Sequence, residues 1–228
     1  MHCVCMLIKG SLSVMSFKFR TVFAVAALAC SAPLTAFAQV VTDPAQVQAG
    51  YYKVEPLHTQ VSFSVLHLGF TVYEGLFSGA SGVLLLDPRQ PESSSLTVSV
   101  PVASVQTTSS KLTEELKGKD WLGAEQFPKA EFVSVSVKRT SNGDALVSGN
   151  LTLHGITRPE TLHVHFIGAG VNMLDKKYTV GFDATSTIKR SEFGIKTFVP
   201  YISDEVELKI AGAFERQDTQ PAMKDPND

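Results

Sequence analysis

Cysteine is scarce in this sequence of 228 residues, and its three copies lie near the start of the chain, at Cys3, Cys5 and Cys30. The chain after Cys30 therefore has no disulfide, no cysteine nucleophile and no thiolate metal site. A domain of ~190 residues buries enough apolar surface to fold without such cross-links. We expect core packing alone to stabilise it.

Signatures of catalysis and of nucleotide binding are missing as well. The sequence has no Gly-x-Ser-x-Gly, no His-Glu-x-x-His, no phosphate-binding glycine loop and no paired cysteines. We therefore predict that the protein is not an enzyme, with no catalytic residue, no cofactor and no bound metal. The alternative is an enzyme that acts on lipid, for which His58 with Glu55 is the only candidate acid–base pair.

The apolar segment near the start is too short to anchor the chain in a membrane. Lys18 and Arg20 precede an uncharged stretch, which Ala36-Phe37-Ala38 ends with small residues. A charged start, an apolar middle and an Ala-x-Ala end are typical of a secretory signal peptide. A proline and polar residues interrupt the ~20 apolar residues that a membrane span needs. We predict a signal peptide over residues 1–38, cleavage after Ala38 and a periplasmic location.

Two details of this segment leave alternatives open. Met15 directly precedes the signal, so residues 1–14 either belong to it or lie before the true start. Cys30 in Ala-Leu-Ala-Cys is a loose match to a lipidation site, although Leu28 fits that pattern poorly. Ordinary cleavage is the preferred interpretation.

Positive charge is in short supply once the signal is removed. The full chain has 20 basic and 22 acidic residues. Residues 1–38 contain Lys9, Lys18 and Arg20 and no acid, which leaves 17 basic against 22 acidic residues, a net charge of −5. A mildly acidic surface argues against nucleic acid and against anionic lipid headgroups as partners. We expect a neutral or apolar partner.

Alternation of apolar and polar residues predicts strands along most of the remaining chain. Asn142-Gly143 between two such runs indicates a hairpin, and Gly155 with Pro159 is expected to end the strands on either side of residues 155–160. The expected strands cover residues 51–54, 59–66, 83–86, 95–107, 131–139, 145–153, 161–166, 178–187 and 205–214, with a glycine-rich stretch at 69–82 and one helix at 108–123.

This pattern predicts one all-β domain over residues 51–216, an extended antiparallel barrel of about eight strands with one short helix. Residues 39–50 are expected to form a linker and residues 217–228 a disordered tail. A barrel of this size is either filled by its side chains or holds one small ligand. The many Val, Ser, Thr and Gly residues of the strands would leave room inside. The residues expected in an apolar wall are Val61, Phe63, Val65, Phe77, Val100, Phe182 and Phe193.

Histidines are the first polar candidates for a site. His163 and His165 lie two apart on a strand and point to one side, as a metal clamp or as part of a solvated face. No third ligand stands at suitable spacing, which favours the solvated face. His58 and His67 flank the strand at 59–66 and are either a polar handle for a ligand head or hydrogen-bonded strand ends.

Arg190 and two aromatic residues are further candidates. Arg190 follows a strand and precedes a glycine turn, where it would bind a phosphate or carboxylate headgroup or, as we prefer, pair with a nearby acid or cap exposed backbone carbonyls. Trp121 and Phe127 lie at the end of the predicted helix. They would either cover a cavity or pack the helix onto the barrel.

The region from Tyr51 to about Phe214 carries short motifs whose order and spacing resemble the YceI-like family of periplasmic proteins. The motifs are Tyr52-Lys-Val-Glu-Pro-Leu-His58-Thr59, Phe63-x-Val-x-His67-x-Gly69, Glu74-Gly-Leu-Phe-Ser-Gly79, Lys119-Asp-Trp-Leu122, Phe127-Pro-Lys-Ala-Glu-Phe132, Gly149-Asn-Leu-Thr-Leu-His-Gly-Ile-Thr-Arg-Pro159, Gly181-Phe182 and Ile188-Lys-Arg-Ser-Glu-Phe-Gly194. The sequence departs from the family pattern at Glu55 and Glu192, where Asp is frequent, and at Thr59, where Ser is usual. These changes keep the charge or the hydroxyl.

The resemblance implies a lipocalin-like barrel with an elongated apolar interior, in which family members bind polyisoprenoids or other long-chain amphiphiles. It therefore predicts a periplasmic carrier or reservoir for an isoprenoid lipid, with His58, His67 and Arg190 as the polar handle. Two alternatives stay open: a redox accessory protein that delivers a quinone to a membrane cytochrome, and a stress-related interaction module with a filled barrel and no ligand. The oligomeric state is also open, a dimer included.

Overall fold

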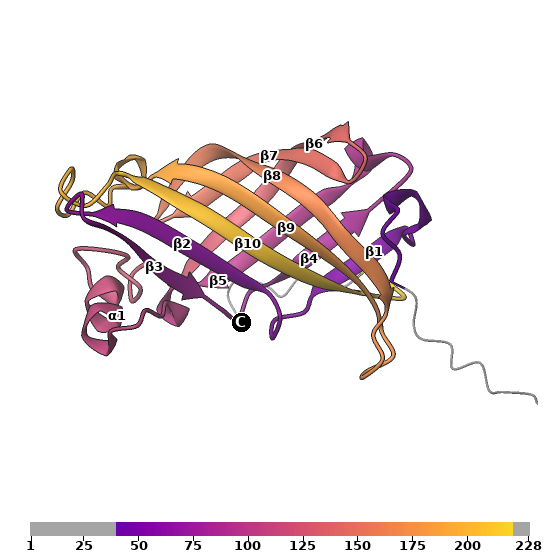
Figure 1. Cartoon of the computed structure of the whole chain (residues 1–228), viewed down its shortest axis with the longest axis horizontal. Helices are drawn as coiled ribbons and strands as arrows, with labels where there is room; N and C mark the ends of the chain where they lie inside the picture. Colours follow the sequence, from indigo (N-terminus) through magenta and orange to yellow (C-terminus); the bar gives the residue numbers. More distant parts are fainter. Residues whose placement is uncertain (1–39, 221–228) are drawn as a thin grey trace, which may run out of the picture. The chain divides into compact units, whose positions relative to one another are not determined.

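The computed structural model describes residues 40–220. Within them the chain forms ten strands, one α-helix and four short 3-10 helices (Figure 1). The predicted signal peptide and the last part of the predicted tail, residues 221–228, lie outside the described residues. The elements are η1 (Pro44–Gln46), β1 (Gly50–Val54), β2 (Gln60–His67), β3 (Thr71–Phe77), β4 (Ser81–Leu86), η2 (Pro91–Ser93), β5 (Ser95–Pro101), η3 (Val102–Ser104), α1 (Ser110–Lys117), β6 (Lys129–Ser141), β7 (Asp144–Leu153), β8 (Ile156–Val171), β9 (Tyr178–Lys189), η4 (Arg190–Phe193) and β10 (Glu205–Arg216).

Eight of the ten strands in residues 40–220 close into an antiparallel barrel. Their order is β1-β4-β5-β6-β7-β8-β9-β10, and β10 pairs back with β1. The other two strands, β2 and β3, form a hairpin that continues the sheet from β10. The predicted fold class, an antiparallel barrel of about eight strands with one short helix, is confirmed.

Strand β10 pairs with two different strands along one of its edges. Its last residues pair with β1, where Phe214 lies opposite Val54, and its first half pairs with β2. Between these two ladders the side chain of Thr59 bonds the backbone of Ala213. The Ala213 N–H donates to Thr59 Oγ1 over 3.0 Å, and the Thr59 hydroxyl donates to the Ala213 carbonyl over 3.2 Å. A buried hydroxyl thus satisfies the backbone where the partner strand changes.

Part of the segment before β1, which the sequence predicts to be a linker, contacts the barrel. Val41 and Ala169 of β8 exchange two backbone hydrogen bonds, 2.7 and 2.8 Å long. Val47 is buried in the apolar core at this end of the barrel. The segment has a polar composition, and only a few of its residues contact the barrel. Its composition therefore gave no indication of this packing.

Pro159 does not end a strand, contrary to the prediction. Strand β8 runs through it, over Ile156–Val171. The chain turns earlier, at His154 and Gly155, whose φ values of 51° and 74° are left-handed. The ladder between β8 and β9 extends only to His163, so no described strand pairs with β8 on that side at Pro159. Its missing N–H therefore leaves no gap in a ladder.

The helix is shorter than the predicted 108–123. It begins after Ser109, whose side chain accepts a hydrogen bond from the Leu112 N–H over 3.3 Å, and it ends before Gly118. The sequence between Gly118 and β6 continues in turns. In Figure 1, α1 lies outside the barrel wall, at the end where β2 and β3 meet.

Two glycines with left-handed backbone conformations provide a test of the wall. A Cβ atom on Gly82 of β4 (φ 155°) would lie 2.2 Å from the Thr97 carbonyl oxygen of β5, whereas one on Gly69 (φ 73°) would meet no atom within 4 Å. We expect Gly69→Ala to lower the free energy of unfolding by about 1–2 kcal/mol, the cost of the conformation alone. Gly82→Ala should cost clearly more, because the strands must also separate. Chemical unfolding curves measure both, and equal losses would contradict the close approach of β4 and β5.

Candidate functional site

The barrel encloses a cavity of about 870 Å³. All ten described strands contribute side chains to its lining, which is almost entirely apolar, and Leu112 and Leu116 of α1 line it as well. This volume falls within the ~300–1,000 Å³ that is usual for small-molecule sites. The interior is therefore not filled by side chains, and the alternative of a filled barrel does not hold.

The cavity stays open because the inward residues are too small to meet across the barrel. Val98, Val100, Leu208 and Ile210 point inward yet are only half-buried, since open space lies in front of them. Inward positions on β9 and β10 carry residues as small as Ala184 and Gly212. Side chains of this size leave a passage along the barrel axis.

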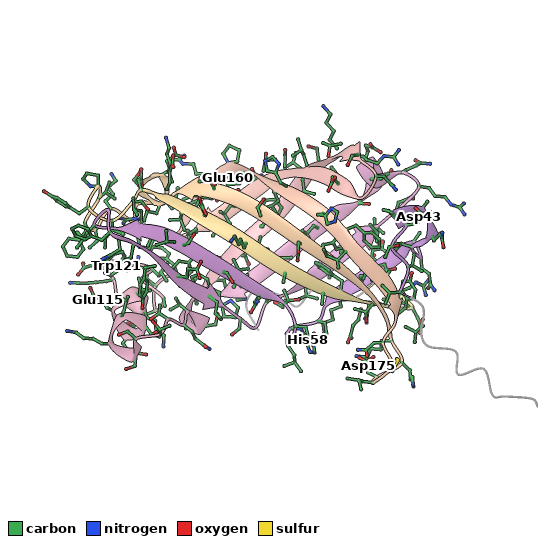
Figure 2. All side chains as sticks on the ribbon, in the orientation of Figure 1. Asp43, His58, Glu115, Trp121, Glu160 and Asp175 are labelled. Carbon is green, nitrogen blue, oxygen red and sulfur yellow. The ribbon has the colours of Figure 1, made fainter. Side chains whose placement is uncertain are left out.

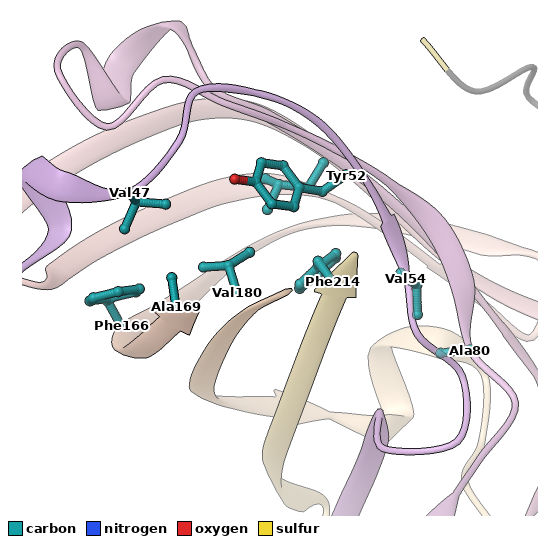
Figure 3. Close-up of a cluster of buried hydrophobic side chains, with 9 residues drawn as sticks. Val47, Tyr52, Val54, Ala80, Phe166, Ala169, Val180 and Phe214 are labelled. Carbon is teal, nitrogen blue, oxygen red and sulfur yellow. The ribbon is translucent and has the colours of Figure 1, made fainter. Parts of the chain in front are cut away.

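One end of the barrel is packed. Tyr52 and Val54 of β1, with Phe214 of β10, meet Phe166 of β8 and other apolar side chains in a buried cluster (Figure 3). The ring of Phe182 lies 5.7 Å from that of Phe166 and 6.1 Å from that of Phe214, measured between centroids. Val47 from the segment before β1 completes the cluster. Several side chains of this cluster line the cavity, whose lining reaches Pro44 at this end.

The opposite end is open. Leu68, Phe198 and Tyr201 line the cavity and are also exposed, so they mark where it reaches the surface. Trp121 lines the same region and lies 6.2 Å from Phe198, between ring centroids. Figure 2 shows Trp121 close to Glu115 of α1, at this end of the barrel. We call this opening the mouth.

Six of the seven residues predicted for the apolar wall line the cavity: Val61, Phe63, Val65, Phe77, Val100 and Phe182. The rings of Phe63 and Phe77 pack 5.6 Å apart on the β2–β3 hairpin. Phe193 is the exception. It is fully buried in η4, among Ile188 and Val206, and is not part of the lining. Phe193 lies beyond the expected strand at 178–187, in the 3-10 helix that follows β9, where its side chain packs into the core beside the cavity.

Only one of the two histidines predicted as polar handles lines the cavity. His67 is the last residue of β2 and lines the cavity at the mouth. His58 does not line the cavity but lies on an outer turn, with Nδ1 2.6 Å from Glu55 Oε2. Burial of Glu55 opposes its ionisation, but the N–H groups of Leu57 and His58 and the His58 ring hold its pKa below the usual range. The candidate acid–base pair is thus outside the cavity.

Arg190 lines the cavity, but its guanidinium is hydrogen-bonded to the backbone. It is 4% exposed, and its nitrogens donate to the carbonyls of Ile195, Thr197, Ile202 and Ser203 over 2.8–3.1 Å. The guanidinium also stacks over Trp121 at 5.6 Å. Burial lowers its pKa, although Asp204 opposes this. This arrangement is the carbonyl-capping alternative, and contact with a headgroup stays a prediction.

His163 and His165 lie on the outer face of β8 and are exposed. His165 Nδ1 is 2.6 Å from Asp144 Oδ1. Within residues 40–220 no group of three His, Cys, Asp or Glu side chains is placed to hold a metal ion. No helix in the same residues is long and apolar enough to cross a bilayer.

Glu160 and Ser186 are polar residues of the lining that the sequence analysis missed. Ser186 is 8% exposed and follows Ala184 on the inward face of β9. Burial raises the pKa of Glu160, and the charge of Glu192 raises it further. The alternation of Glu160 with Leu162 on β8 could have identified it. The expected strand break at Pro159 concealed that alternation.

Residues 52–214 match the family described as the YceI-like domain. The chain belongs to this family. A UPF0312 protein of Shewanella sp. (strain W3-18-1) is 35% identical over 156 residues, which cover 68% of this chain and 81% of that protein. The resemblance expected from the sequence motifs is thereby confirmed.

Solved structures share the YceI-like barrel. The crystal structure of BcnA from Burkholderia cenocepacia is 27% identical, with a TM-score of 0.64, over 70% of this chain and 98% of BcnA. A polyisoprenoid binding domain from Saccharophagus degradans is 13% identical, with a TM-score of 0.53, over 75% of this chain and 100% of that domain. The latter similarity is one of fold.

Replacement of Arg190 tests whether it supports the loop or a ligand. Arg190→Ala would leave four carbonyls without their donor, and we expect it to lower the free energy of unfolding by about 3 kcal/mol or more. Arg190→Lys should recover only part of this loss, because an ammonium lacks the planar fork. Urea unfolding gives both values. An Arg190→Ala protein with unchanged stability but less bound ligand would instead assign Arg190 to ligand contact.

Glu160 makes stability depend on pH. Because its pKa is raised in the folded state, the folded protein loses stability as pH rises through that value. Glu160→Gln should therefore raise the melting temperature at neutral pH, and the gain should vanish below 4.5, the ordinary pKa of a glutamate. Thermal melts at both pH values measure this, with exposed Glu205→Gln as control. A gain that is independent of pH would contradict the assignment.

Proposed function

We propose that this protein is a periplasmic lipid-binding protein, which holds a polyisoprenoid or a similar long-chain amphiphile inside its barrel as a carrier or reservoir. The observation that carries the proposal is the cavity itself: a largely apolar space of about 870 Å³ inside the barrel, which reaches the surface at the mouth. An amphiphile fits this space with its tail inside and its polar head at the mouth.

The energetics predict that the protein selects its ligand by the apolar tail more than by the polar headgroup. Burial of an alkyl chain contributes roughly 0.8 kcal/mol per CH₂ group, so about ten carbons contribute ~8 kcal/mol before losses. Ordering of the chain and desolvation of the head offset a large part of this. Most of the lining surface is apolar; among its polar residues, His67 and Tyr73 lie near the mouth and Glu160 and Ser186 further along the wall. Tail length should therefore set the affinity.

Two further observations support the proposal. The related domain from Saccharophagus degradans, which shares the barrel fold, is described as polyisoprenoid-binding. The predicted signal peptide supports export, which would bring the protein to a compartment between two membranes. A carrier there must shield the tail from water, and the closed wall of the barrel suits that task.

The test is mass spectrometry of an organic extract from protein purified from its own periplasm without detergent. We expect an isoprenoid lipid at close to one molecule per barrel. An empty, well-folded protein would contradict the proposal, as would a bound molecule with no long apolar chain.

Variants of the wall make the test specific. Phe182→Asp or Phe63→Asp places a charge in the cavity and should abolish co-purification of lipid, because the carboxylate cannot be solvated there. Val100→Phe fills the space without adding charge and should reduce the bound lipid or shorten its tail. Thr185→Asp, on the exposed face of β9, is the control and should bind as the unaltered protein does. Unchanged lipid in both Val100→Phe and a folded aspartate variant would contradict the wall assignment.

A further inference from the structure

Large apolar side chains are exposed to solvent at the mouth. Phe70 is 84% exposed and Tyr201 70% exposed, values that are unusual for residues of this size. They belong to two segments, the tip of the β2–β3 hairpin and the connection between η4 and β10, which lie together at one end of the barrel in Figure 1. We call the exposed apolar side chains of these segments the rim; they are Leu66, Leu68, Phe70, Val72, Phe198 and Tyr201.

The rim is built as one unit. The Leu68 N–H donates to the Tyr201 carbonyl over 2.8 Å, and the Ser203 N–H donates to the Leu66 carbonyl over 2.9 Å. Arg190 then binds four carbonyls of the same connection from the inside, at residues 195, 197, 202 and 203. The exposed side chains are therefore carried on backbone that is held in place.

The backbone of the rim also keeps two apolar side chains in unusual conformations. Leu68 and Phe198 have φ values of 54° and 57°, in the left-handed region that bulky residues rarely adopt. They are two of the four non-glycine residues with positive φ within residues 40–220. Such conformations cost free energy and concentrate at functional sites. Glycine would relieve this cost, but it would remove the apolar side chain.

Charge is absent from the rim. Residues 65–73 and 197–203 contain no Asp, Glu, Lys or Arg. An exposed surface with this composition does not attract charged partners, and it is not suited to contact with water. Three of its members, Leu68, Phe198 and Tyr201, also line the cavity. The apolar surface is thus continuous from the outside of the rim to the interior.

We propose that the rim inserts into the interfacial layer of a lipid bilayer, so that the mouth opens directly onto the membrane from which lipid is loaded or to which it is released. The inference rests on the proposed function and adds its site of exchange. A tail that moves along the rim into the cavity stays in apolar surroundings, whereas a free passage would expose it to water. A second copy of the chain on the rim would instead close the mouth.

The chemistry of the rim specifies the membrane surface. Phe and Tyr side chains are favoured at the boundary between headgroups and acyl chains, where Tyr keeps its hydroxyl in the polar layer. Without basic residues in the rim, binding should rest on burial of apolar surface. It should depend little on salt and should not require anionic lipid.

Sedimentation with vesicles of phosphatidylcholine, with the protein purified from the periplasm, tests this proposal. Phe70 does not line the cavity, so Phe70→Asp alters the rim alone. We expect this change to weaken vesicle binding by about tenfold or more, the loss of one buried aromatic side chain. Phe70→Leu should retain most of the binding. Leu174→Asp is the matched control, because Leu174 is 92% exposed on the turn between β8 and β9, outside the rim, and should bind vesicles normally.

The outcomes separate this proposal from the proposed function. Bound lipid in the purified protein together with no vesicle binding would overturn the rim proposal and leave the lipid-binding function intact. Equal vesicle binding by Phe70→Asp and the unaltered protein would also overturn it. If light scattering finds a dimer that Phe70→Asp dissociates, the rim is a self-association face and the proposal is wrong. Vesicle binding by a protein that never contains lipid would support the rim and contradict the carrier function.

Discussion

Backbone hydrogen bonding around a closed ring is the constraint on which the rest of this structure depends. Each strand of the barrel needs a neighbour on both sides, and β10 meets this need with β1 at one end and β2 at the other. Thr59 bonds the backbone of Ala213 between the two ladders. Because the wall is closed by its backbone, its shape does not require side chains to fill the interior. The barrel can therefore enclose an open cavity without losing its shape.

Stability and function are divided between the two ends of the barrel. Tyr52 and Phe214 belong to the packed cluster at one end, where Val47 adds a contact from outside the barrel. At the other end Phe193 packs with Ile188 and Val206, and Arg190 adds hydrogen bonds to the backbone of the connection that follows it. A polar clamp of this kind holds a loop in shape without occupying the space beside it. The mouth is therefore both ordered and open.

Much of this could be read from the sequence, because period-two alternation reports which side chains face inward. Val61, Phe63 and Phe182 were assigned to the wall for that reason, and they line the cavity. The pattern gave no guide at Phe193, which lies beyond the expected strand in η4, and it was misapplied where proline was taken as a strand end. The position of Arg190 after a strand and before a glycine turn did suggest a bond to backbone carbonyls, but which carbonyls it meets could not be read from the sequence. Motif order, by contrast, was sufficient to indicate the family.

The distribution of polarity along the cavity has a consequence for specificity. A head at the mouth meets the His67 ring and the hydroxyl of Tyr73, whereas the Arg190 guanidinium is engaged by carbonyls. A mouth of this kind offers a headgroup few partners, whereas the apolar wall offers a tail contact along the barrel. If the proposed function holds, the wall therefore contributes more to the choice of ligand than the mouth does.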